Sequence, residues 1–217
     1  MTRGPVIAID GPAGSGKSTL ARGLSERLGL PYVNTGAMYR ALTREALLSA
    51  VDVGDGGSLA RLARGLEFAI GGERPGTLLV HGAEPGSELS SEEVESSVSR
   101  ASAHPEVRAV MCELQRDLGR DGAVMEGRDI GSVVFPDAEV KIFLTASLAV
   151  RASRRVRERG GGGQVPKELA ARDMKDATIN PFVPSEDAAG IDTTAKGIRE
   201  VLDEALAIVR EKLEGRT

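Results

Sequence analysis

The chain has 217 residues, of which 41% are hydrophobic and 28% are charged, and its formal net charge is −4. These values predict a soluble globular protein that buries a full core, as one domain or as one domain with an insert. The negative charge, the 3% aromatic content and the lack of Trp argue against a nucleic-acid-binding protein. No apolar run is long enough to span a membrane, and no signal-peptide core follows Met1. With Cys112 as the single cysteine, we expect a cytoplasmic protein without disulfides.

The first predicted elements are a strand over 5–10 and a helix over 19–28, joined by a glycine-rich loop that fits the pattern G-x-x-x-x-G-K-[ST]. Glycines let several backbone N–H groups converge on one phosphate, and the helix start adds unpaired N–H donors. Lys17 is then placed to reach the β- and γ-phosphates, and the Ser18 hydroxyl to ligate Mg²⁺. The predicted phosphate site consists of Gly11, Pro12, Ala13, Gly14, Ser15, Gly16, Lys17, Ser18 and Thr19.

The next predicted elements are a short strand over 31–33 and a helix over 36–50 with Thr35 as its N-cap. Glycines at 54–57 then break the pattern. A short helix and two antiparallel strands follow, over 58–65, 66–70 and 77–81. Because this hairpin interrupts an alternating order of strands and helices, we interpret about 55–100 as a small α/β insert.

The second half alternates again between helices and strands. Helices are predicted over 105–118, 149–159, 166–176 and 195–213, and strands over 123–126 and 140–144, with a weak strand ending at 191–192. Cys112 falls in the apolar pattern of the helix over 105–118, which predicts a packed core thiol. Strands separated by helices predict an α/β fold: three α/β/α layers around a parallel sheet, with ligands at the carboxyl ends of the strands.

A Gly-Arg-Asp sequence directly after the strand over 123–126 is the first candidate site at that edge. Arg128 can clamp a phosphate bidentately, and Asp129 can accept hydrogen bonds from a base amine or serve as a general base. The structural alternative is an Arg–Asp pair that caps the loop. Arg40, in the helix after the second strand, is another candidate phosphate clamp.

The helix over 149–159 carries five arginines and is followed by the glycines at 160–163. Arg151, Arg154 and Arg155 share one face by their spacing. Such a face repels itself unless anions neutralise it, so we interpret the segment as a lid that closes over phosphates and excludes water. A solvated basic helix face is the alternative.

Several motifs, in the same order, resemble bacterial cytidylate kinase: Ile9–Ser18, Thr35–Arg40, Gly127–Pro136, Val140–Leu144 and Arg172–Asp176. The resemblance covers nearly the whole chain. It implies a single P-loop kinase domain with a core of 1–54, 101–150 and 177–217, a monophosphate-binding insert of 55–100 and a helical lid of 151–176. The implied reaction transfers the γ-phosphoryl group of ATP to CMP or dCMP, with Mg²⁺ held by Ser18, and we expect a monomer.

The resemblance also implies roles for single residues. Arg40 and Arg128 hold the acceptor phosphate, Ser99, Arg108 and Asp129 recognise cytosine, and Arg172 and Asp176 act from the lid. Thr35 joins the CMP site, Arg154 and Arg155 the ATP site, and Lys17, Arg128 and Arg172 are the catalytic set. Because the acceptor phosphate is already an anion, no general base is needed, and Asp129 then recognises rather than deprotonates.

Two features depart from the family pattern. No Arg occurs between Arg172 and Arg199, where the family usually has one, and Asn34 stands where the family frequently has Asp, which changes how waters around Mg²⁺ are held. Two other functions stay open on the residues alone. One is a P-loop kinase of another monophosphate or of a hydroxyl metabolite, with Asp129 or Asp10 as base. The other is a nucleotide-dependent regulatory switch.

Overall fold

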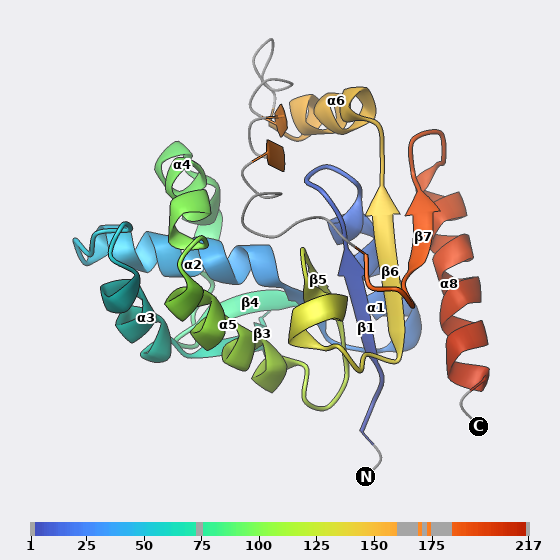
Figure 1. Cartoon of the computed structure of the whole chain (residues 1–217), viewed down its shortest axis with the longest axis horizontal. Coiled ribbons are helices and arrows are strands. Elements are labelled where there is room, and N and C mark those ends of the chain that lie inside the picture. The colour runs from blue at the N-terminus through green and yellow to red at the C-terminus, as the bar shows by residue number, and fades with distance from the viewer. Residues whose placement is uncertain (1–2, 73–75, 160–168, 171–172, 175–183, 216–217) are drawn as a thin grey trace.

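A five-stranded parallel sheet forms the centre of the computed structural model, which describes residues 3–72, 76–159, 169–170, 173–174 and 184–215 (Figure 1). The strand order is β2-β5-β1-β6-β7. The bounds of these strands are Val6–Asp10 for β1, Tyr32–Asn34 for β2, Ala123–Gly127 for β5, Val140–Thr145 for β6 and Ala189–Asp192 for β7. The predicted parallel sheet, including its weak last strand, is confirmed.

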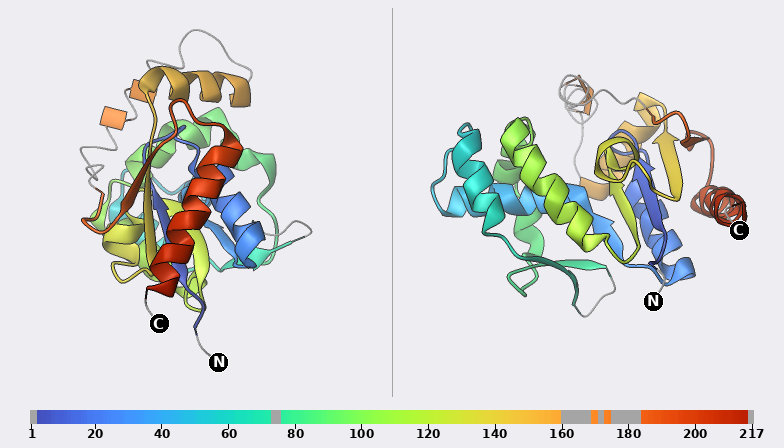
Figure 2. Two further views of the ribbon diagram at one scale, coloured as in Figure 1. Left: turned by 90° about the vertical axis from the view of Figure 1, so that its right-hand side faces the viewer. Right: turned by 60° about the horizontal axis from the view of Figure 1, so that its bottom comes forward.

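Two hydrophobic cores lie on the two faces of this sheet. Along β1, Val6 and Ala8 belong to one core and Ile7 and Ile9 to the other, as the alternation of side chains along a strand requires. Helices α1 (Lys17–Leu28) and α8 (Ile198–Glu214) cover one face (Figure 2), while α2 (Thr35–Leu48) and α5 (Pro105–Leu118) cover the other. The predicted three layers are therefore present. Among the described residues, no helix combines the length and the apolar character that a membrane span needs.

The segment predicted as an insert contains α3 (Gly56–Arg64), the antiparallel strands β3 (Phe68–Gly71) and β4 (Thr77–Val80), the short turn η1 (Gly86–Ser90) and α4 (Glu92–Ala101). Apolar side chains of α3 and β4 belong to the same core as those of α2 and α5. The segment thus extends one face of the main core, and α4 packs against α2 (Figure 1). Its assignment as the monophosphate-binding unit stays a prediction.

Two local predictions are corrected by the structure. The N-cap of α2 is Asn34, not Thr35: the extended backbone of Asn34 lets its Oδ1 accept a hydrogen bond from the Ala37 N–H at 2.9 Å. Thr35 is instead the first helical residue, buried in the site edge. Cys112 packs against the core but stays partly exposed, so it is less enclosed than predicted, although burial still raises the pKa of its thiol.

The predicted arginine-rich helix is α6 (Leu148–Arg159), which follows β6 and lies above its carboxyl end in Figure 1. The glycines at 160–163 lie outside the described residues, as does most of the helix predicted over 166–176. The structure thus confirms a helix over 148–159, and its assignment to a lid stays a prediction.

Gly11, the first residue of the phosphate loop, lies so close to β6 that a substitution there tests this contact. Its φ is +144°, and a Cβ there would meet the Leu144 carbonyl oxygen at 2.2 Å, whereas Gly29, the C-cap of α1 at φ +66°, has open space. We predict that Gly29→Ala costs about 1–2 kcal/mol of unfolding free energy, the cost of a left-handed backbone alone. Gly11→Ala should cost more, because β6 must also move. Urea unfolding measures both, and equal losses would contradict the close approach of the loop to β6.

Candidate functional site

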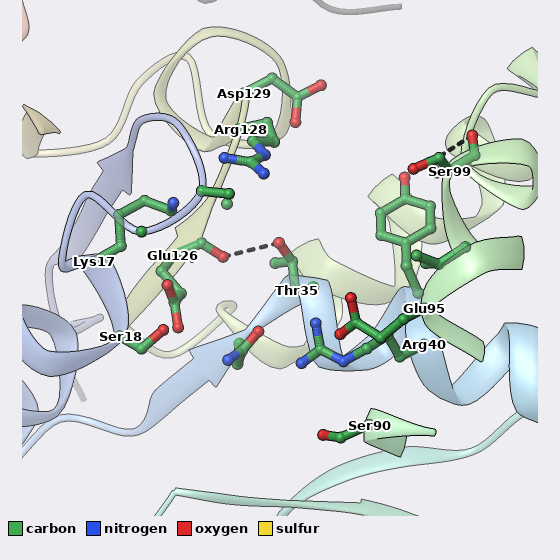
Figure 3. A pocket seen from close by; sticks show the side chains of 18 of the residues that line it. Lys17, Ser18, Thr35, Arg40, Ser90, Glu95, Ser99, Glu126, Arg128 and Asp129 are labelled. Atoms are coloured by element: carbon green, nitrogen blue, oxygen red, sulfur yellow. Dashed lines mark hydrogen bonds between the residues drawn. The ribbon is translucent and has the colours of Figure 1, made fainter. Parts of the chain in front are cut away.

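The carboxyl ends of β1, β2 and β5 meet at a pocket that also touches α2, α4 and α5 (Figure 3). On one side, called here the loop side, lie Lys17, Ser18 and Glu126. On the other, called the helix side, lie Arg40 and Ser99. The predicted residues that line this pocket are Ala13, Gly14, Gly16, Lys17, Ser18, Thr19, Thr35, Arg40, Ser99, Arg108, Arg128, Asp129 and Arg155. Arg172 and Asp176 lie outside the described residues.

The phosphate loop keeps its carbonyl groups occupied by cationic side chains. Arg128 donates to the Gly11 carbonyl at 2.6 Å, and Lys17 donates to the Pro12 carbonyl at 2.9 Å. Two arginines of α6 hold the next three carbonyls: Arg151 donates to Ala13, and Arg154 donates to Gly14 and Ser15. With its carbonyls turned to these cations, the loop can present N–H groups to an anion in the pocket.

The predicted arginine face of α6 is therefore divided between two tasks. Arg154 contacts loop carbonyls and the Thr193 hydroxyl, at 2.9 Å, and Arg151 is buried against the loop and pairs with Asp173 at 2.6 Å. Arg155 lines the pocket itself. The helical spacing predicted that these three arginines share one face, but not that two of them touch the backbone of the loop.

The surroundings of Lys17 shift the pKa of its ammonium group in opposite directions. Its side chain is partly buried at the pocket, and burial lowers the pKa of Lys17 to about 7, with the positive charge of Arg128 adding to the effect. The carboxylates of Glu126 and Asp10 act in the opposite direction. An anion bound at the loop would favour the charged ammonium again, so this lysine is poised to respond to phosphate.

Asp10 joins the end of β1 to the segment that carries Arg128 and Asp129. Its two carboxylate oxygens accept hydrogen bonds from the N–H groups of Ile130 and Gly131, each at 2.8 Å, at the start of the single turn η2 (Ile130–Val134). Burial raises the pKa of Asp10 to about 6 against the lowering effect of these bonds. With both oxygens committed to backbone, Asp10 is poorly placed to act as the general base that the sequence left open.

The helix side brings together residues from segments far apart in the chain. Arg108 of α5 donates to Asp129 at 2.7 Å, and both side chains remain partly exposed to the pocket. Ser99 and Glu95 reach the same side from α4, and Arg40 from α2 (Figure 3). The result is a concave surface with the Arg40 guanidinium, the Glu95 carboxylate and the Arg108–Asp129 pair, suited to an anionic ligand that also carries hydrogen-bonding groups.

Glu126 is the main site residue that the sequence interpretation left without a role. It is 4% exposed, its Oε1 accepts a hydrogen bond from the Tyr32 hydroxyl, and its carbonyl accepts one from Thr35 Oγ1 at 2.8 Å. Burial, and next the charge of Glu126, raise the pKa of Tyr32. The available signal was its place at the end of a buried strand, immediately before Gly-Arg-Asp. Ser90, Glu95, Ser102 and Tyr39 also line the pocket without having been predicted.

Comparison with known proteins gives one consistent result. The family model described as cytidylate kinase matches residues 7–211. The chain is 43% identical to the cytidylate kinase of Shouchella clausii, covering 97% of this chain and 98% of that one, and 43% identical to the cytidylate kinase of Solibacter usitatus, covering 96% and 93%. Among solved structures, the protein TT1252 from Thermus thermophilus aligns with a TM-score of 0.52 at 20% identity, over 98% of this chain and 99% of that one, a likeness of fold alone.

The lowered pKa of Lys17 predicts that a triphosphate binds together with a proton. At about pH 8 the free lysine is mostly neutral, and the bound anion moves its pKa back toward the ordinary value near 10.5, so uptake of up to one proton is expected. Calorimetric titration with inorganic triphosphate in buffers of different ionisation enthalpy measures this number. Lys17→Met should abolish it. Equal proton uptake by the wild type and the variant would contradict the assignment.

Proposed function

The chain belongs to the cytidylate kinase family, and we propose that its pocket joins ATP on the loop side to CMP or dCMP on the helix side, with transfer of the γ-phosphoryl group to give ADP and CDP or dCDP. Family membership makes it an ATP-dependent nucleoside monophosphate kinase. The single observation that carries the division of the pocket is Arg128, which lines it while donating to Gly11 of the phosphate loop. One residue thus borders both substrates.

On the loop side, the loop N–H groups and Lys17 bind the triphosphate of ATP, with Arg155 of α6 near them. Mg²⁺ fits the residues present, because the Ser18 hydroxyl and the Glu126 carboxylate are the hard oxygen ligands that this ion prefers, directly or through water. When bound, the ion neutralises charge on the β- and γ-phosphates. Ser18 and Glu126 are therefore the residues that would hold it.

On the helix side, Arg40 and Arg128 clamp the monophosphate, and the Arg108–Asp129 pair with Ser99 recognises the base. The exocyclic amine of cytosine is a donor that suits the Asp129 carboxylate, and the adjacent ring acceptors suit the Arg108 guanidinium. Uracil presents a carbonyl where cytosine presents its amine, and that carbonyl would face the carboxylate. Because the Asp129 carboxylate can accept a hydrogen bond from the amine but not from the carbonyl, the pocket selects cytosine over uracil.

Catalysis in this arrangement rests on positioning and on charge. The acceptor is already an anion, so the residues have no proton to remove, and Lys17 and Arg128 stabilise the charge that spreads over the transferred group. We assign the same kind of role to Arg172, and ribose and phosphate contacts from the lid to Asp176. The hydroxyl-kinase alternative needs a general base, and the engaged oxygens of Asp10 and the Arg108 pairing of Asp129 give it no support. The regulatory-switch alternative has no use for a helix side that binds an acceptor.

The acceptor preference is directly testable. With ATP and Mg²⁺, we predict that ADP release in a coupled assay is fast with CMP and dCMP and at least about 100-fold slower, in kcat/KM, with AMP and UMP. Comparable rates with UMP would contradict recognition through Asp129. ATP binding without turnover on any monophosphate would instead favour the regulatory switch.

Asp129→Ala separates recognition from base catalysis. If Asp129 recognises cytosine, the variant loses about 10–100-fold in kcat/KM for CMP, mainly through KM, while the weak reaction with UMP changes little. Loss of a general base would instead lower kcat by the same factor for every acceptor. Steady-state kinetics with CMP and UMP, measured side by side, distinguish the two outcomes.

A further inference from the structure

A chain of hydrogen bonds runs from the start of α2 to the carboxylate on the loop side of the pocket. Asn34 Nδ2 donates to the Tyr32 hydroxyl at 3.1 Å, and the Tyr32 hydroxyl donates to Glu126 Oε1. Tyr32 and Glu126 are each 4% exposed, and they belong to neighbouring parallel strands, β2 and β5. None of these three residues was assigned a role from the sequence motifs, apart from the departure noted at Asn34.

The direction of this chain is fixed by chemistry. Asn34 Oδ1 is already used as the N-cap acceptor for the Ala37 N–H, so its amide nitrogen is the atom that faces Tyr32. An amide NH₂ group only donates, so the tyrosine hydroxyl must accept from it and point its own proton at Glu126. Asn34 therefore sets the orientation of the hydroxyl, and the hydroxyl sets the carboxylate.

The Tyr32 ring is also held in place by contacts that do not involve its hydroxyl group. The ring belongs to the core on the α1 face of the sheet, and the Arg22 guanidinium lies 5.5 Å from its centroid. A phenylalanine can keep these contacts. The hydroxyl can thus be removed alone, which makes its role separable from packing.

We propose that Tyr32 and Asn34 are positioning residues for the metal-side carboxylate. Resting on the Mg²⁺ site of the proposed function, the inference is that Tyr32 occupies Oε1 of Glu126, fixes the carboxylate plane and leaves Oε2 to meet Mg²⁺ or one of its waters. Partners of this kind, which orient a ligand without touching the metal, commonly change metal affinity when removed.

The test is equilibrium binding of ATP, with no acceptor present, measured by calorimetry in Mg²⁺ and again in EDTA. The ratio of the two dissociation constants is the gain due to the metal. We expect Tyr32→Phe to reduce this gain by about 10-fold while binding in EDTA stays within about two-fold of the wild type. Asn34→Ser keeps a neutral N-cap but cannot reach Tyr32, so it should give a smaller loss in the same direction.

Tyr39→Phe is the matched control, since Tyr39 is the only other tyrosine of the chain and lines the same pocket. It should leave the gain due to Mg²⁺ unchanged. An undiminished gain in Tyr32→Phe, or equal weakening with and without Mg²⁺, would overturn the proposal. If Tyr32→Phe fails to fold in a thermal melt, Asn34→Ser decides. A wild type that gains nothing from Mg²⁺ would instead contradict the metal site of the proposed function.

Discussion

The site depends first on how the carbonyl groups of the phosphate loop are satisfied. A peptide group that points its N–H into a pocket points its carbonyl the other way, and a buried carbonyl needs a donor. Here five successive carbonyls, from Gly11 to Ser15, receive hydrogen bonds from the cationic side chains of Lys17, Arg128, Arg151 and Arg154. These side chains fix the orientation of the loop, and because Lys17 and Arg128 also line the pocket, the geometry and the electrostatics of the anion site have a common origin.

The same contacts connect the two halves of the pocket. Arg128 follows β5 and reaches the loop after β1, while Asp10 at the end of β1 accepts from the backbone just beyond Asp129. Each strand end therefore holds the loop of its neighbour. Because β1 and β5 are adjacent and parallel, the loop side and the helix side are positioned by one pair of strands. A substitution at the end of either strand is therefore expected to change the geometry of both the loop side and the helix side.

Local patterns in the sequence predicted the parts of this arrangement that local physics decides. The glycine-rich motif, the apolar run of β1 and the three-and-four spacing of the arginines depend on neighbours in the chain, and each was found where expected. The choice between Asn34 and Thr35 as N-cap was missed because both residue types cap well and only the extended backbone at 34 distinguishes them. Glu126 was missed because its partner Tyr32 is 94 residues away, and periodicity carries no signal for such a pairing. The contacts of Arg154 with the loop carbonyls were not predicted for a related reason: spacing specifies a helix face, whereas the atoms that it meets come from another segment.

The two buried carboxylates at adjacent strand ends illustrate how surroundings divide roles between similar groups. Asp10 gives both oxygens to backbone N–H groups, and the pKa of its carboxyl is raised to about 6 by burial. Glu126 is held at one oxygen by a phenol and lines the pocket. A carboxylate closed in by backbone fixes a loop, whereas one with an oxygen directed to the pocket can serve a cation. The chemistry of the site therefore depends less on the presence of acidic residues at this edge than on which donors have already engaged them.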